Sequence, residues 1–140
     1  MIEAQQVNLV AVVGQGGTIG PADALPSMMD RAEAEWFQEW FMDLTEDGII
    51  VMGHRSLGWL TERGVNLGPR HTLIAWSRDA TYDPDDFLSA LYETDKPIFI
   101  CGGLTTYRTF MPYVRQFFIR RVGLDAPHDN YMPPLFGRTI

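Results

Sequence analysis

The feature that most constrains the fold of this chain is a short apolar run that ends at two consecutive glycines. Residues 97–101 read Pro-Ile-Phe-Ile-Cys, Gly102 and Gly103 follow, and the next apolar residues have helical spacing. This pattern predicts a strand, a tight turn and a helix. Two residues without a Cβ let a backbone or a ligand approach closely, and a helix start offers N–H groups to an anion such as phosphate. A plain turn is the alternative.

Three further apolar runs end in a comparable way. They are residues 7–13 before Gly14, residues 49–52 before Gly53, His54, Arg55 and Ser56, and residues 72–76 before Ser77 and Arg78. Helical patterns separate the runs, so we expect an α/β fold with an open, mainly parallel central sheet flanked by helices on both faces. Ligands of such sheets bind beyond the carboxyl ends of the strands. Four junctions at one edge favour an extended phosphate-bearing ligand such as a dinucleotide.

A helix is predicted over residues 30–44, where the apolar residues recur at spacings of one, three and four. Glu33 precedes Trp36 and Phe37 by three and four residues, so it lies on the same helix face as these aromatic residues. A carboxylate among aromatic rings has a raised pKa, which suits proton delivery near neutral pH. The alternative is a capping box, in which Glu33 bonds the backbone N–H of Asp30.

The rest of the chain completes the alternation of helices and strands. We expect a short helix through Leu60, a helix that begins at Asp83-Pro84, and a strand over residues 116–124. A loop is expected over residues 125–134.

Composition limits the class of protein. With 140 residues and 46% hydrophobic content, we expect one compact domain over residues 1–140. The net charge of −7 opposes binding to nucleic acid or to an anionic membrane. Cys101 is the single cysteine, which excludes an internal disulfide and fits a cytoplasmic setting. No apolar stretch approaches the roughly 18 residues of a membrane span, and no metal site is expected.

Together these segments resemble dihydrofolate reductase of the chromosomal type, over about residues 7–134. The matching residues, in the family's order, are Val10-Ala11-Val12, Thr18-Ile19-Gly20, Leu25-Pro26, Glu33 with Trp36-Phe37, Val51-Met52-Gly53-His54-Arg55-Ser56, Leu67 with Arg70, Ser77-Arg78, Ile100-Cys101-Gly102-Gly103 with Tyr107, and Asp129 with Met132-Pro133.

The resemblance implies hydride transfer from NADPH to the pterin ring of 7,8-dihydrofolate, which yields tetrahydrofolate. Glu33 would support protonation of the adjacent ring nitrogen, and Leu25 would belong to a loop that closes over the nicotinamide, so these two are the expected catalytic residues. The implied substrate-binding residues are Val12, Glu33, Phe37, Leu60, Leu67, Arg70, Cys101 and Tyr107. The implied cofactor-binding residues are Ala11, Ile19, Gly20, Gly53, His54, Arg55, Ser56, Ser77, Arg78, Cys101, Gly102, Gly103, Leu104, Thr105 and Tyr107.

Several residues depart from the family's pattern. Ser27 stands where a Trp usually follows Leu-Pro, and His54 replaces a common Arg beside the cofactor phosphates. Leu104 and Thr105 stand where small or basic residues are frequent. Arg120 occupies a position where a Thr commonly joins the hydrogen-bond network of the pterin.

The end of the chain also departs from the family. Members normally continue past the Asp129–Pro133 region with an antiparallel strand pair, so we expect a C-terminally truncated sheet whose exposed edge is covered by a homodimer or in another way. Two other functions stay open. One is a related reductase acting on another pyrimidine or pterin, although Glu33 together with Arg70 favours folate. The other is a ligand-binding or structural subunit without turnover.

Overall fold

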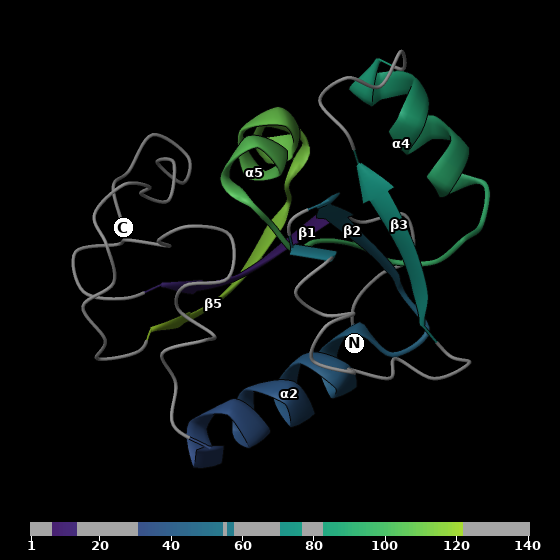
Figure 1. The fold of residues 1–140 in the computed structure, drawn as a ribbon. Helices are drawn as coiled ribbons and strands as arrows, with labels where there is room; N and C mark the ends of the chain where they lie inside the picture. Colours follow the sequence, from purple (N-terminus) through teal and green to yellow (C-terminus); the bar gives the residue numbers. More distant parts are fainter. Residues whose placement is uncertain (1–6, 14–30, 55, 58–70, 77–82, 122–140) are drawn as a thin grey trace.

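Five parallel strands form one sheet in the order β3-β2-β4-β1-β5 (Figure 1). The computed structural model describes residues 7–13, 31–54, 56–57, 71–76 and 83–121. The elements along the chain are β1 (Val7–Val13), α2 (Arg31–Thr45), β2 (Ile49–Gly53), β3 (Thr72–Trp76), α4 (Pro84–Tyr92), β4 (Ile98–Ile100), α5 (Leu104–Phe110), the 3₁₀ helix η2 (Met111–Tyr113) and β5 (Gln116–Arg121).

The three inner strands are buried on both faces. Every residue of β4 is buried, as are all but one in each of β1 and β2. The sequences of such strands are nearly continuous apolar runs, because side chains on both faces of the sheet are shielded from water. The register joins Val7 of β1 to Ile98 of β4, and Ile98 in turn to Ile49 of β2. The predicted central strands are therefore confirmed.

Two hydrophobic layers lie on opposite faces of the sheet. On one face, the buried side chains of α4 and α5, Leu88, Leu91 and Phe110 among them, pack against the sheet. On the other face, Phe41 of α2 packs against Phe99 of β4. Figure 1 shows α2 on the side of the sheet opposite to α4 and α5. The predicted α/β fold with helices on both faces is confirmed.

The N-terminus of α4 follows the sequence prediction. Asp83 is the N-cap, and its carboxylate accepts a 2.9 Å hydrogen bond from the backbone N–H of Asp85. Pro84 occupies the first helical turn, where its missing N–H costs no intrahelical bond. Local sequence is sufficient to start this helix.

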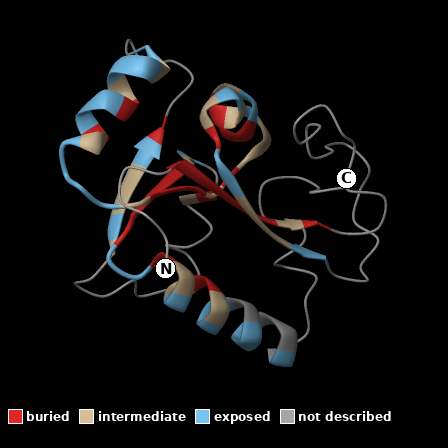
Figure 2. Cartoon of the chain, turned by 180° about the vertical axis from the view of Figure 1, so that it is seen from behind, coloured by how far each residue is buried: buried red, intermediate tan, exposed pale blue. Residues whose placement is uncertain are grey.

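The apolar face of α2 becomes more buried along the helix (Figure 2). Trp36 is 47% exposed, Trp40 is half-buried and Phe41 is buried. The sequence predicted one broad apolar face and the helix has it, but the face is covered fully only where it crosses the inner strands. Strand β5 ends at Arg121 in the described part, and the expected residues 122–124 lie outside it.

Candidate active site

The carboxyl ends of β2 and β4 are in direct contact. The backbone N–H of Gly53 donates a 2.8 Å hydrogen bond to the carbonyl oxygen of Gly102, and the N–H of Cys101 donates one of 2.9 Å to that of Val51. Because all five strands are parallel, β1, β3 and β5 end at this same edge. Two of the glycine junctions predicted from the sequence thus form one continuous backbone surface.

Gly102 and Gly103 turn the chain from β4 into α5 and are joined by a cis peptide bond. Gly102 has a φ of 122°, a conformation that L residues rarely adopt. A Cβ at Gly102 would also lie 3.4 Å from both Ser56 Oγ and the Tyr107 hydroxyl. At Gly103, where φ is −88°, the nearest atom to an added Cβ is Ser56 Oγ at 3.7 Å, an ordinary contact. The turn itself requires glycine at 102, whereas an added Cβ at Gly103 would make only an ordinary contact.

Two hydroxyl side chains lie beside these glycines. Ser56 is 6% exposed and Thr106 is 3% exposed. A Cβ at Gly53 would lie 3.1 Å from Thr106 Oγ1, which is tighter than an ordinary contact. The junction therefore combines closely approaching backbone with two hydroxyl groups, which can donate hydrogen bonds to phosphate oxygens.

Tyr107 connects the helix after the glycines to the first strand. Its phenol donates a 2.7 Å hydrogen bond to the carbonyl oxygen of Val10, and its backbone N–H bonds the carbonyl oxygen of Gly103 at 2.9 Å. Burial raises the pKa of Tyr107 well above its ordinary value, with the nearby Cys101 as a smaller cause. Tyr107 is therefore a neutral donor.

Cys101 lies at the end of β4 on the face that α2 covers. It packs against the hydrophobic cluster of that face, and its thiol donates a 3.4 Å hydrogen bond to the carbonyl oxygen of Phe99. Burial raises the pKa of the Cys101 thiol. Cys101 therefore behaves as a small apolar residue and not as a nucleophile.

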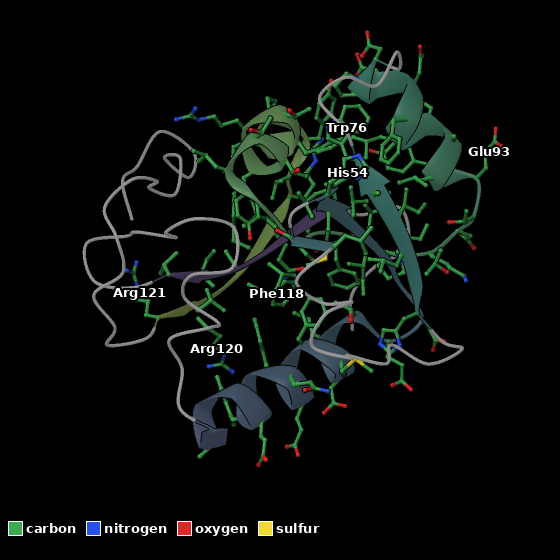
Figure 3. The ribbon with its side chains drawn as sticks, viewed as in Figure 1. His54, Trp76, Glu93, Phe118, Arg120 and Arg121 are labelled. Carbon is green, nitrogen blue, oxygen red and sulfur yellow. The ribbon has the colours of Figure 1, made fainter. Side chains whose placement is uncertain are left out.

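Arg120 lies on the same face of the sheet, at the position of β5 that is paired with Val12 of β1. Its guanidinium carbon is 4.9 Å from the ring centroid of Trp36 and 5.1 Å from that of Trp40. The two indoles are parallel, with an interplanar angle of 5° and centroids 6.3 Å apart. Figure 3 shows Arg120 reaching from β5 toward α2, whereas Arg121 points away from that helix.

Comparison with known proteins gives this edge of the sheet a family context. A family model described as dihydrofolate reductase matches residues 6–138. The chain belongs to the dihydrofolate reductase family. The dihydrofolate reductase of Staphylococcus haemolyticus is 24% identical over 136 residues, which cover 91% of this chain and 76% of that protein.

A solved structure supports the same fold. Dihydrofolate reductase from Enterococcus faecalis, complexed with NADP(H) and RAB-propyl, matches with a TM-score of 0.71 and 15% sequence identity. The match covers 96% of this chain and 81% of that one. At this identity, the likeness establishes the dihydrofolate reductase fold.

The structure brings most of the described cofactor-binding candidates together between β2 and α5. They are Gly53, His54, Ser56, Gly102, Gly103, Leu104, Thr105 and Tyr107. His54 and Thr105 are exposed, and Leu104 is half-buried. On β1, Ala11 packs into the cluster on the face of α4 and α5, so the alternation of the strand places Val12 on the face of α2.

The side chains of the other predicted site residues are not described by the structure. Glu33 and Phe37 lie within α2, but their side chains are not among those that the structure describes. Ile19, Gly20, Leu25, Arg55, Leu60, Leu67, Arg70, Ser77 and Arg78 lie outside the described residues, as do Asp30 and Ser27. Their roles stay predictions.

Two features of the site were missed by sequence reasoning. Thr106 lies three residues after Gly103, a spacing that brings its side chain back over the start of α5, and this helical period could have indicated it. The contact of Arg120 with two tryptophans could not have been found in this way, because it depends on how α2 crosses β5.

The described residues contain neither a metal-binding group nor a helix that could span a membrane. No group of three or more His, Cys, Asp or Glu side chains is arranged there to hold a metal ion. Within the same residues, no helix combines the length and the apolar character that a membrane crossing requires.

Proposed function

We propose that this chain catalyses the NADPH-dependent reduction of 7,8-dihydrofolate to tetrahydrofolate. The observation that carries the proposal is the hydrogen bond between Gly53 N–H and Gly102 O, which joins two strand-glycine-helix junctions into one surface. In an open parallel sheet, this edge is where an extended ligand binds. Membership of the dihydrofolate reductase family supports the choice of reaction.

The residues around the glycines fit a nicotinamide cofactor. Gly103 has no side chain to keep a ligand away from its backbone, and the Ser56 hydroxyl lies 3.7 Å from the point where a Cβ would stand. Thr106 and Ser56 would donate hydrogen bonds to the phosphates. In their expected roles, Arg55 and Arg78 would add positive charge and Ser77 a further hydroxyl donor. When bound, NADPH supplies the hydride. The relative from Enterococcus faecalis was solved with NADP(H), which supports this cofactor for the family.

Glu33 would support protonation of the pterin. It stands in the first turn of α2, the helix on the same face of the sheet as Val12 and Cys101. A carboxyl group held near apolar and aromatic side chains can exchange its proton near neutral pH. Arg70 would pair with the glutamate carboxylate of the substrate, for which a planar guanidinium is well shaped.

The test follows NADPH absorbance at 340 nm with 7,8-dihydrofolate for the wild type, Glu33→Gln and Glu35→Gln. Glu35 is an exposed residue of the same helix and differs from Glu33 by two positions, so it is a matched control. We expect Glu33→Gln to lower kcat/KM by at least about 100-fold at neutral pH, as loss of a proton-transfer group does. Glu35→Gln should keep activity within about twofold.

The outcomes separate the competing functions. A folded wild type that binds NADPH but shows no turnover would favour the ligand-binding subunit. Turnover that is faster with another pterin or pyrimidine than with dihydrofolate would favour the related reductase. The expected homodimer stays a prediction, which light scattering at high micromolar concentration would test.

A further inference from the structure

We propose that the Thr106 hydroxyl, which has no hydrogen-bond partner among the described residues, donates to a diphosphate oxygen of the bound cofactor. The identity of the ligand rests on the proposed function. The unpartnered state of the hydroxyl is a property of the fold alone, so it can be tested without a ligand.

The hydrogen bonding of Thr106 differs from that of other threonines in the helices of this chain. A helical threonine hydroxyl commonly bonds the carbonyl oxygen four residues earlier. Thr45 of α2 does so at 2.8 Å, and Thr109 of α5 does so at 2.9 Å. Within the described part of the chain, no hydrogen bond involves the hydroxyl of Thr106, although this residue is only 3% exposed.

The position of Gly102 explains the difference. Its carbonyl oxygen is the one four residues before Thr106, but Gly102 precedes α5 and has a φ of 122°. This oxygen accepts the 2.8 Å hydrogen bond from the backbone N–H of Gly53 on β2. The bond that joins the two strand ends therefore commits the usual acceptor of Thr106 to β2.

The Thr106 hydroxyl lies where a ligand of this sheet would bind. Its oxygen is 3.1 Å from the point where a Cβ of Gly53 would stand, and the backbone nitrogen of Gly103 is 3.7 Å from that point. Gly53 ends β2 and Gly103 follows β4, so the hydroxyl stands at the carboxyl ends of two inner strands. In open parallel sheets, ligands bind beyond these ends.

Ser56 provides a second hydroxyl of the same kind. It is 6% exposed, and its oxygen lies 3.4 Å from the point where a Cβ of Gly102 would stand. It too makes no hydrogen bond in the described part of the chain. Neither this oxygen nor that of Thr106 is among the fully enclosed unpartnered atoms of the described residues, so each retains some accessible surface.

Unpartnered polar groups in a protein interior destabilise the fold, so a pair of them at a ligand edge calls for an acceptor. An anionic oxygen accepts the strongest hydrogen bonds from such donors. In nucleotide-binding folds, glycines at a strand end let the backbone approach a pyrophosphate. The diphosphate is also the part of a dinucleotide without a ring, which suits the close approach that Gly53, Gly102 and Gly103 permit.

The first measurement is urea unfolding of the ligand-free protein. Thr106→Val replaces the hydroxyl with a methyl group and keeps the β-branched shape. Because no hydrogen bond is lost, we expect the urea midpoint to stay the same or to rise. Thr45→Val is the contrast, since it removes a bonded hydroxyl from a residue that is 0% exposed, and it should lower the midpoint. An equal decrease in both variants would overturn the proposal.

The second measurement is fluorescence titration with NADPH and with NADH, which share the diphosphate but not the 2′-phosphate. Thr106→Val should raise the Kd for both by about tenfold, as loss of a hydrogen bond to a charged acceptor does. Thr106→Ser keeps a hydroxyl and should restore most of the affinity. Thr109→Val, whose hydroxyl is already bonded, should change either Kd by less than about twofold.

Two binding results would contradict this role of Thr106. A change of less than about twofold in Thr106→Val would mean that the hydroxyl does not contact the cofactor. Weakened binding of NADPH alone would place the contact at the 2′-phosphate and not at the diphosphate. If Thr106→Val does not fold, Thr106→Ala removes the same hydroxyl and replaces it in the titrations.

Turnover separates this proposal from the proposed function. A wild type that binds both dinucleotides but does not reduce dihydrofolate would contradict the proposed function, while the Thr106 result would stand. A wild type that reduces dihydrofolate, with equal Kd values in Thr106→Val, would contradict the role of Thr106 alone. Binding of neither dinucleotide would overturn both.

Discussion

The phenol of Tyr107 on α5 donates a 2.7 Å hydrogen bond to the backbone carbonyl oxygen of Val10 on β1, 97 residues earlier in the chain. This bond attaches the helix that follows the two glycines to the first strand of the sheet. It lies in the interior, where an unpaired polar group is costly.

Tyr107→Phe should lower the free energy of unfolding by about 1–2 kcal/mol, because it removes the phenol donor from a buried carbonyl group and keeps most of the packing. Urea unfolding followed by circular dichroism measures the change. The matched control is Tyr92→Phe, a half-buried tyrosine of α4, for which we expect less than about 0.5 kcal/mol. Equal effects of the two substitutions would show that the bond to Val10 contributes nothing special.

Substitutions at the two glycines should separate folding from cofactor binding. Gly102→Ala forces an L residue to a φ of 122° and should cost at least about 1 kcal/mol of stability. Gly103→Ala meets its nearest atom at 3.7 Å and should cost less. If the cofactor approaches this turn, Gly103→Ala should still raise the Kd for NADPH by about tenfold or more. A tenfold change in Kd corresponds to about 1.4 kcal/mol of binding free energy.

Fluorescence titration with NADPH measures the binding of both variants. A Gly103→Ala variant that binds NADPH as tightly as the wild type would mean that these glycines only turn the chain, which is the alternative interpretation of the sequence.

The Cys101 thiol should make the protein less stable at alkaline pH. Burial raises its folded pKa above the ordinary 9.0, so the unfolded chain releases this proton first as pH rises. The contribution to stability is complete below the unfolded pKa and is lost above it, by up to roughly 1.4 kcal/mol per pH unit. Urea midpoints at pH 7 and pH 10 should differ more for the wild type than for Cys101→Ala. An identical pH dependence would contradict the assignment.

Tyr113 of η2 should titrate unusually late. Its phenol donates a hydrogen bond to the carboxylate of Asp85 at the start of α4, and this bond with the nearby negative charge raises the pKa of Tyr113 to about 12. Ultraviolet difference titration at 295 nm, with Tyr113→Phe subtracted, isolates this phenol. In Asp85→Asn the pKa should move back toward the ordinary 10.0. No movement would mean that the carboxylate is not the cause.

The strands and the capped helix were predictable from local sequence because their physical causes are local. Residues 7–13 and 98–100 are apolar throughout, which suits strands buried on both faces, and Asp83-Pro84 contains the chemistry of a helix start. The alternation of these elements was enough to predict the α/β fold. The glycines at 53, 102 and 103 were found because each group directly follows an apolar run in the sequence.

The neighbours of each glycine could not be read from the sequence. Gly53 bonds Gly102, 49 positions away, only because β2 and β4 are adjacent in a sheet whose order differs from the order of the chain. The Thr106 hydroxyl lies beside Gly53 for the same reason, because α5 follows β4 and β4 is the neighbour of β2 in the sheet.

The sequence by itself determined the elements, the class of fold and the resemblance to dihydrofolate reductase, since each rests on residue type and spacing. Only the tertiary structure decided that Tyr107 bonds Val10 and that Arg120 lies over Trp36 and Trp40. Each of these contacts joins a helix to a strand that is distant in the sequence. Its distance depends on how the helix packs on the sheet, and the spacing of residues along the chain carries no information about that packing.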